Sequence, residues 1–334
     1  MICCKSKETS NVLSEEDKVE GIEKAFKIEI FDNEALGVID PNATIEVLAK
    51  GFAWTEGPLW INEDGGYLLF SEIPSNTVYK LESDGAVSPY LTPSGYTGEG
   101  SYSGEPGSNG LLLNSAGELV LMQHGDRRVG KMEAPLSAPD EKYLTLADNY
   151  QGKKLNSPND ACFDREGNLY FTDPPYGLPK QMDDPRKELS FQGVYFLDNN
   201  RKLTLLDSLT RPNGIGLSPD QSQLYVAVSD PEHAVWYKYD ISKPGIVSNR
   251  QLFYDVTALI GEPGQQGLPD GLKIHSSGLI FATGPGGVWV FNPSGVAIAK
   301  IQTGQNTSNC AFDDNENNLY MTADDYVLSV SLKK

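Results

Sequence analysis

The sequence has few of the residues on which several kinds of site depend. It contains 4 cysteines and 3 histidines in 334 residues. Four cysteines are too few to form a disulfide framework in a chain of this length, and no pair of them has a metal-binding spacing. The histidines lie far apart in the sequence, at His124, His233 and His275, which disfavours a histidine-rich zinc site. No apolar run is long enough to span a bilayer.

Positive charge is also scarce. There are 27 Lys and Arg residues against 46 Asp and Glu residues, so the formal net charge is −19. Binding to a phosphate backbone needs clusters of Lys and Arg, and we therefore expect no nucleic-acid partner. The excess of negative charge is most simply a solvated acidic surface that favours solubility.

The N-terminus differs in character from the rest of the chain. Residues 1 to about 21 are polar and charged without a strand pattern, which predicts a flexible tail before a single domain at 22–334. Cys3 and Cys4 leave the compartment open. The protein is cytoplasmic, or it is periplasmic or lipid-anchored if one of them is the remnant of a lipoprotein signal.

The domain itself lacks any long stretch with a helical period of 3.6 residues, and short apolar runs alternate with turns instead. Tyr67 to Ser71, for example, follows the turn residues Gly65-Gly66. This alternation favours an all-β fold.

The apolar runs recur at a long period. Their centres at Leu68, Leu119, Leu169, Leu224, Ile280 and Leu319 are 51, 50, 55, 56 and 39 residues apart. A repeat near 50 residues is typical of propeller blades, each of which has four short strands. Without the first 45 residues or so, six units of roughly 48 residues remain, which predicts a six-bladed β-propeller. We expect Thr44 to Phe52 to close the ring by pairing with Tyr326 to Leu332, because an unpaired edge invites aggregation.

A polar residue precedes each strand centre by 10 to 12 residues. The six are Glu56, Asn109, Asn159, Asn213, Asp270 and Asn309. Equivalent positions in equivalent blades lie at the same distance from the axis, so these side chains should form a ring around the channel. Carboxylates and amide oxygens are ligands for hard divalent cations. A single Asn or Asp of this kind more often caps a turn, but six in register favour a cation site.

These motifs resemble the family that includes senescence marker protein, gluconolactonase and luciferin-regenerating enzyme, with the bacterial gluconolactonases most similar. The stretches that match begin at Glu56-Gly57-Pro58, His124-Gly125-Asp126, Asn156-Ser157-Pro158, Asp173-Pro174-Pro175, Arg211-Pro212-Asn213, Leu268-Pro269-Asp270 and Thr283-Gly284-Pro285. Their order and spacing together are specific, and they span roughly residues 45 to 332. The resemblance implies a six-bladed propeller with one catalytic divalent cation at the channel mouth.

The resemblance also implies roles for individual residues. Glu56, Asn213 and Asp270 would bind the cation, Asn159 would be a further ligand or hold substrate, and Asp270 would be the catalytic base. The residues expected to contact substrate are Asn109, Asn159, His124, Arg128 and Tyr176. Gln123 is a departure, since Glu usually precedes the His-Gly stretch in this branch.

An all-oxygen ligand set favours Ca²⁺, and Mg²⁺, Mn²⁺, Zn²⁺ and Fe²⁺ remain open. The expected reaction is opening of a sugar lactone to the aldonic acid. Two alternatives stay open at this point: hydrolysis of a phosphotriester at the same metal site, and a metal-binding propeller without turnover. The sequence does not identify the lactone or the oligomeric state.

Overall fold

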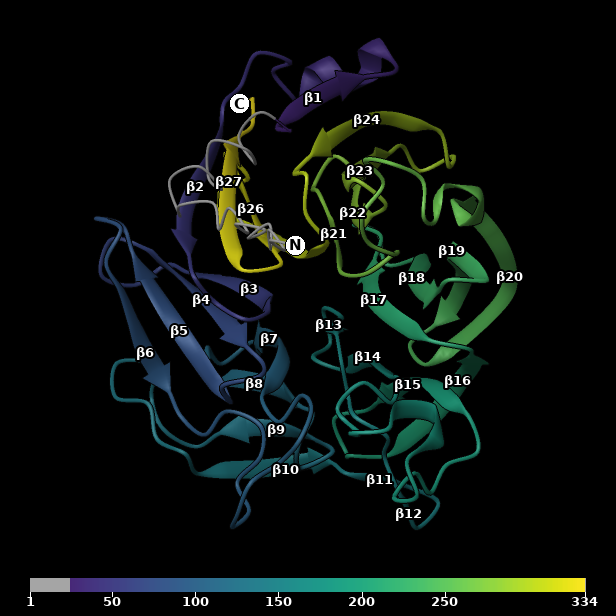
Figure 1. Cartoon of the computed structure of the whole chain (residues 1–334). Coiled ribbons are helices and arrows are strands. Elements are labelled where there is room, and N and C mark those ends of the chain that lie inside the picture. Colours follow the sequence, from purple (N-terminus) through teal and green to yellow (C-terminus); the bar gives the residue numbers. More distant parts are fainter. Residues whose placement is uncertain (1–24, 334) are drawn as a thin grey trace, which may run out of the picture.

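A computed structural model describes residues 25–333 (Figure 1). Six antiparallel sheets stand around a central axis as the blades of a β-propeller, which confirms the predicted fold class. The predicted N-terminal tail at 1–21, and with it Cys3 and Cys4, lies outside the described residues. No helix in the described part is long and apolar enough to cross a membrane.

Blades one to three follow one another along the chain. Blade one contains β3 (Thr55–Ile61), β4 (Tyr67–Glu72), β5 (Thr77–Glu82) and β6 (Val87–Leu91). Blade two contains β7 (Ser108–Leu113), β8 (Leu119–Gln123), β9 (Arg128–Met132) and β10 (Tyr143–Ala147). After the hairpin of β11 (Asn149–Tyr150) and β12 (Lys153–Lys154), blade three contains β13 (Ala161–Phe163), β14 (Leu169–Asp173), β15 (Gln192–Leu197) and β16 (Leu203–Leu209).

Blades four to six complete the ring. Blade four contains β17 (Pro212–Leu217), β18 (Gln223–Asp230), β19 (His233–Lys243) and β20 (Ile246–Asp255). Blade five contains β21 (Leu272–Ile274), β22 (Ile280–Gly284), β23 (Gly287–Phe291), β24 (Ala297–Gln302) and, as a fifth strand, β1 (Lys27–Ile30). Blade six contains β25 (Thr307–Phe312), β26 (Asn318–Ala323), β27 (Tyr326–Ser331) and β2 (Ile45–Lys50). Short 3₁₀ helices are η1 (Asn33–Gly37), η2 (Gln181–Asp183) and η3 (Thr257–Leu259).

The ring closes as the sequence predicts. Strand β2 pairs antiparallel with β27, with Ile45 opposite Val330 and Lys50 opposite Tyr326. Blade six is therefore built from both ends of the domain, with β2 as the outermost strand, paired to β27. The role of β1 was not predicted: it extends blade five, with Ile28 opposite Ile301.

The core consists of six apolar clusters, one between each pair of neighbouring blades. Because both faces of each second strand are covered, the side chains of β4 alternate between two clusters. Leu69 packs with Leu121 of blade two, whereas Phe70 packs with Val327 of blade six. This explains why the second strands are continuous apolar runs rather than alternating ones.

Hydroxyl groups on the second strands link neighbouring blades near the axis. Ser71 Oγ donates to Asn109 O at 2.8 Å and Thr172 Oγ1 donates to Asn213 O at 2.7 Å. Thr283 Oγ1 donates to Ser308 O at 3.0 Å. Each bond joins the second strand of one blade to the first strand of the next. These bonds fix the backbone of residues that carry the polar ring.

We expect Thr172→Val to lower the free energy of unfolding by about 1–3 kcal/mol, because the buried Asn213 carbonyl loses this donor and valine supplies none. Denaturant unfolding followed by circular dichroism measures the change. The exposed Thr210 offers a matched Thr→Val control, with an expected change within about 0.5 kcal/mol. Equal stability of the two variants would contradict a role for the hydroxyl link.

Candidate active site

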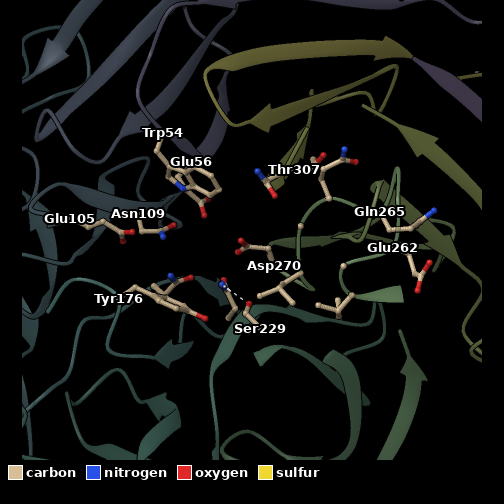
Figure 2. Close-up of a pocket in the computed structure, with 18 of the residues that line it drawn as sticks. Trp54, Glu56, Glu105, Asn109, Tyr176, Ser229, Glu262, Gln265, Asp270 and Thr307 are labelled. Atoms are coloured by element: carbon tan, nitrogen blue, oxygen red, sulfur yellow. Dashed lines mark hydrogen bonds between the residues drawn. The ribbon is translucent and has the colours of Figure 1, made fainter. Parts of the chain in front are cut away.

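A cavity of about 600 Å³ opens at one end of the channel, and five of the six predicted ring residues line it. They are Glu56, Asn109, Asn159, Asn213 and Asp270. Tyr176, predicted to contact substrate, also lines the cavity. Figure 2 shows the side chains of Glu56, Asn109 and Asp270 directed toward the same central space. The sequence spacing thus identified residues that the fold does bring together.

Asn309, the sixth ring residue, does not line the cavity. Its amide partly offsets the raised pKa of Glu56, and its Oδ1 accepts from the Lys273 ammonium at 3.4 Å. Lys273 Nζ also lies 3.6 Å from Asp160 Oδ2. The sixth position therefore supports a neighbour in the ring and contacts a half-buried positive charge.

Glycines place the ring residues close to one another. Four of the six are followed directly by Gly, and each of these glycines contacts the ring residue of the next blade. A Cβ on Gly57 would lie 2.1 Å from Asn109 O, and one on Gly214 would lie 2.2 Å from Asp270 O. A side chain at Gly57 or Gly214 would push the next blade outward, because the obstructing atoms there belong to the backbone.

Asn159 is positioned by a turn as well as by its contact with Gly110. The carboxylate of Asp173 accepts hydrogen bonds from the backbone N–H groups of Asn156 and Ser157, each at 2.8 Å. Asn159 N then donates to Thr172 O at 2.9 Å. Burial raises the pKa of Asp173 to about 7, against the opposing effect of these N–H groups. Asp173 therefore fixes the conformation of the backbone that precedes Asn159.

Two buried carboxylates face each other across the cavity. Burial raises the pKa of Glu56 to about 8, and the charge of Asp160 adds to the rise. Burial also raises the pKa of Asp270 well above its ordinary range, with further contributions from the charges of Glu56 and Asp160. Strongly raised carboxylate pKa values in a cleft are typical of a functional site.

Several buried oxygens around these carboxylates lack hydrogen-bond donors. Within the described residues, Asn109 Oδ1, Asn159 Oδ1 and Asp270 Oδ1 have no partner. Leaving such atoms unpaired costs free energy, and a hard cation would satisfy them together with the two negative charges. Within residues 25–333, no three His, Cys, Asp or Glu side chains converge on one point, so a cation here would need the amide oxygens. The donor set fits a divalent cation.

Arg128, which was predicted to contact substrate, does not line the cavity. Its Nε donates to Gln123 Oε1 at 2.5 Å, and its Nη2 lies 3.0 Å from Asp126 Oδ2. Gln123 in turn donates from Nε2 to Ser94 O at 2.7 Å. An amide can both accept from Arg128 and donate to a carbonyl, whereas an ionised carboxylate can only accept. This accounts for Gln at position 123.

His124, also predicted to contact substrate, lies behind the cavity wall. Its side chain is fully buried and does not line the cavity. Its Nδ1 lies 3.3 Å from Oε2 of Glu105, a residue that does line the cavity.

Three parts of the wall were not among the predicted site residues. Glu105 lies in the loop between β6 and β7, Trp54 precedes β3, and residues 260–268 form a strap along one side of the cavity. Lys300 Nζ donates to Gln265 Oε1 at 2.6 Å and so fastens this strap to blade five. The length of the Gly- and Pro-rich segment at 261–267 was the available signal, since long loops are often functional.

Comparison with known proteins agrees with this geometry. The family profile described as "SMP-30/Gluconolactonase/LRE-like region" matches residues 54–325. A gluconolactonase of Zymomonas mobilis is 36% identical over 313 residues, covering 92% of this chain and 86% of that protein. The lactonohydrolase oryL of Aspergillus oryzae is 28% identical over 51% of this chain and 43% of its own length. A solved gluconolactonase structure from Xanthomonas campestris has a TM-score of 0.78 at 27% identity, covering 92% of this chain and 95% of that one. This homology supports lactone hydrolysis.

The raised pKa of Glu56 predicts how the stability of the cation-free protein depends on pH. A carboxyl whose pKa is higher in the folded state stabilises that state when protonated. This contribution is complete below the ordinary value of 4.5 and is lost as pH rises through about 8. The melting temperature of chelator-treated protein should therefore fall between about pH 5 and pH 8, as scanning calorimetry can measure.

Added Ca²⁺ should restore more stability at the higher pH, because protons compete with the cation for the same oxygens. Asp173 also titrates in this range, but its carboxylate accepts hydrogen bonds from the backbone. Only the increase in melting temperature caused by Ca²⁺ therefore tests the ring residues. A Ca²⁺ effect of equal size at both pH values, or none at either, would contradict the assignment.

Proposed function

This chain belongs to the SMP-30/gluconolactonase/LRE-like family, and from that premise we propose that it hydrolyses a sugar lactone to the aldonic acid with one divalent cation. One observation supports this most strongly. The cavity holds two buried carboxylates with raised pKa values beside amide oxygens that lack donors. Such an arrangement is costly to folding and needs a ligand to satisfy it.

Glu56, Asn159, Asn213 and Asp270 are the residues that would hold the cation. Their oxygens favour Ca²⁺, Mg²⁺ or Mn²⁺ over softer ions. Asn213 Nδ2 donates to Ser229 Oγ at 3.0 Å, and Ser229 Oγ donates to Pro269 O. These bonds fix the amide of Asn213 beside Asp270. When bound, the cation supplies positive charge that polarises the lactone carbonyl and favours ionisation of water.

Asp270 is the proposed general base. Water attacks the acyl carbon, Asp270 takes one of its protons, the ring C–O bond breaks, and the proton passes to the departing ring oxygen. Water is thereby added across the ester, and a hydroxy acid is formed. A carboxylate whose pKa lies above its ordinary range is a stronger base than one in water, and it works best nearer neutral pH.

Asn109, Asn159 and Tyr176 are the side chains from the predicted set that remain as candidates for holding the substrate, since all three line the cavity. Asn109 and Asn159 each offer an amide group with an unpaired oxygen. A sugar lactone has several hydroxyl donors, which match these acceptors.

We expect Asp270→Asn to lower kcat by about 10²–10⁴-fold, because an amide cannot accept the proton from water. A pH-indicator assay with glucono-1,5-lactone, in the presence and absence of chelator, measures this rate. A panel of other lactones and an organophosphate triester separates the proposed activity from phosphotriester hydrolysis. Asp314→Asn at a position outside the cavity is the matched control. Unchanged kcat in Asp270→Asn would refute the assignment of the base.

A further inference from the structure

Glu105 places a third carboxylate on the cavity wall, and neither the proposed base nor the proposed cation site uses it. Its side chain is 34% exposed and lines the cavity. Figure 2 shows Glu105 on the same side of the cavity as Asn109. The negative charge of Glu105 contributes to the raised pKa values of Glu56 and Asp270. Glu105 therefore lines the same cavity as the proposed base.

The backbone around Glu105 is fixed. Pro106 O accepts a hydrogen bond from Gly125 N at 3.1 Å. Gly107 N donates to Ile73 O at 3.0 Å, and a Cβ on Gly107 would lie only 2.7 Å from that oxygen. The two residues that follow Glu105 are therefore held against blades one and two. A carboxylate on such a segment can be aimed with little loss of entropy on binding.

His124 approaches the Glu105 carboxylate from behind the wall. Its backbone N–H donates to Gly107 O at 3.1 Å, and its Nδ1 lies 3.3 Å from Glu105 Oε2. Neither ring nitrogen has a hydrogen-bond partner within the described residues. Gly177 packs closely against His124, since a Cβ added at Gly177 would lie 2.9 Å from His124 Cγ. With a proton on Nδ1, His124 would donate a hydrogen bond to the Glu105 carboxylate once substrate binding improves the geometry of this contact.

The charge of the wall restricts what Glu105 can recognise. The described residues that line the cavity include Glu56, Glu105, Glu262 and Asp270 but no Lys, Arg or His. An anionic substituent on the substrate would meet these carboxylates without a compensating cation from the wall. A carboxylate is an acceptor only, and its two oxygens suit two donors at once. Neighbouring hydroxyls on a neutral ring offer such a pair.

We infer that Glu105, positioned by His124, accepts hydrogen bonds from two neighbouring hydroxyls of the lactone ring. It thereby selects neutral polyhydroxylated lactones over lactones that lack hydroxyls or bear an anionic group. This inference rests on the proposed lactonase function and adds a residue that discriminates among lactones. Glu105 contacts substrate, whereas His124 is a positioning residue.

The test compares kcat and KM for three lactones: glucono-1,5-lactone, δ-valerolactone, which has the same ring without hydroxyls, and the 6-phosphate ester of the first. In Glu105→Ala, KM for glucono-1,5-lactone should rise by about 10- to 100-fold with little change in kcat, as expected for a charge-assisted hydrogen-bonded pair. kcat/KM for δ-valerolactone should not change, and that for the phosphate ester should rise. Glu105→Gln should be intermediate for glucono-1,5-lactone.

Two further variants test how Glu105 is held. Asn at position 124 can place an amide N–H near the position of Nδ1, whereas Phe keeps the ring and removes both nitrogens. His124→Asn should retain the low KM for glucono-1,5-lactone, and His124→Phe should raise it. Glu99→Gln, in the same loop but outside the cavity, is the matched control for loss of charge. The Glu105 variants decide the matter alone if His124→Phe does not fold.

A binding measurement makes the inference independent of turnover. Titration calorimetry with 1,5-anhydroglucitol, which has the hydroxyls but no scissile bond, should show weaker binding to Glu105→Ala by a similar factor. Equal losses of kcat/KM on glucono-1,5-lactone and δ-valerolactone, or unchanged affinity for the anhydroglucitol, would overturn the role of Glu105 while leaving the lactonase function intact. Absence of hydrolysis of every lactone by the wild-type protein would instead refute the proposed function, and the inference with it.

Discussion

The close approach of successive blades at the axis is the constraint on which the rest of the structure depends. Glycines follow four of the six ring residues, and the missing side chain at Gly57 or Gly214 is what lets the next ring residue approach. Hydroxyl bonds such as that from Thr172 to Asn213 O hold the same contacts. The hub is narrow enough for carboxylates from blades one and five to share a cavity only because these contacts form.

The polar residues at the axis, which the proposed function needs, lower the stability of the fold. The interblade clusters are apolar and well buried, while the hub gathers Glu56, Asp160 and Asp270 with little compensating positive charge beyond Lys273. Burial and mutual repulsion keep the pKa values of Glu56 and Asp270 high. Natural proteins commonly accept such local cost at a functional site and recover it elsewhere. Here the six apolar interfaces and the closure of blade six provide the compensation.

Much of this was predictable from the sequence because a propeller repeats. Spacing identified the blades, the closure by β2, and five ring residues that share the cavity. Spacing does not predict which side chains contact neighbours within their own blade instead of pointing toward the axis. Arg128 begins β9, and its guanidinium contacts Gln123 and Asp126 rather than the cavity. Glu105 lies in a loop without a counterpart in the other blades, so its place depends on long-range contacts such as Gly107 with Ile73.

We propose that distant oxygens from four blades enclose one cation. Anomalous diffraction from crystals soaked in Mn²⁺ after chelation tests this directly. We expect a single strong peak within coordinating distance of Glu56 and Asp270, with Asn159 or Asn213 completing the contacts, and loss of that peak in Glu56→Gln. A peak elsewhere, or none at the hub of the wild-type protein, would contradict it.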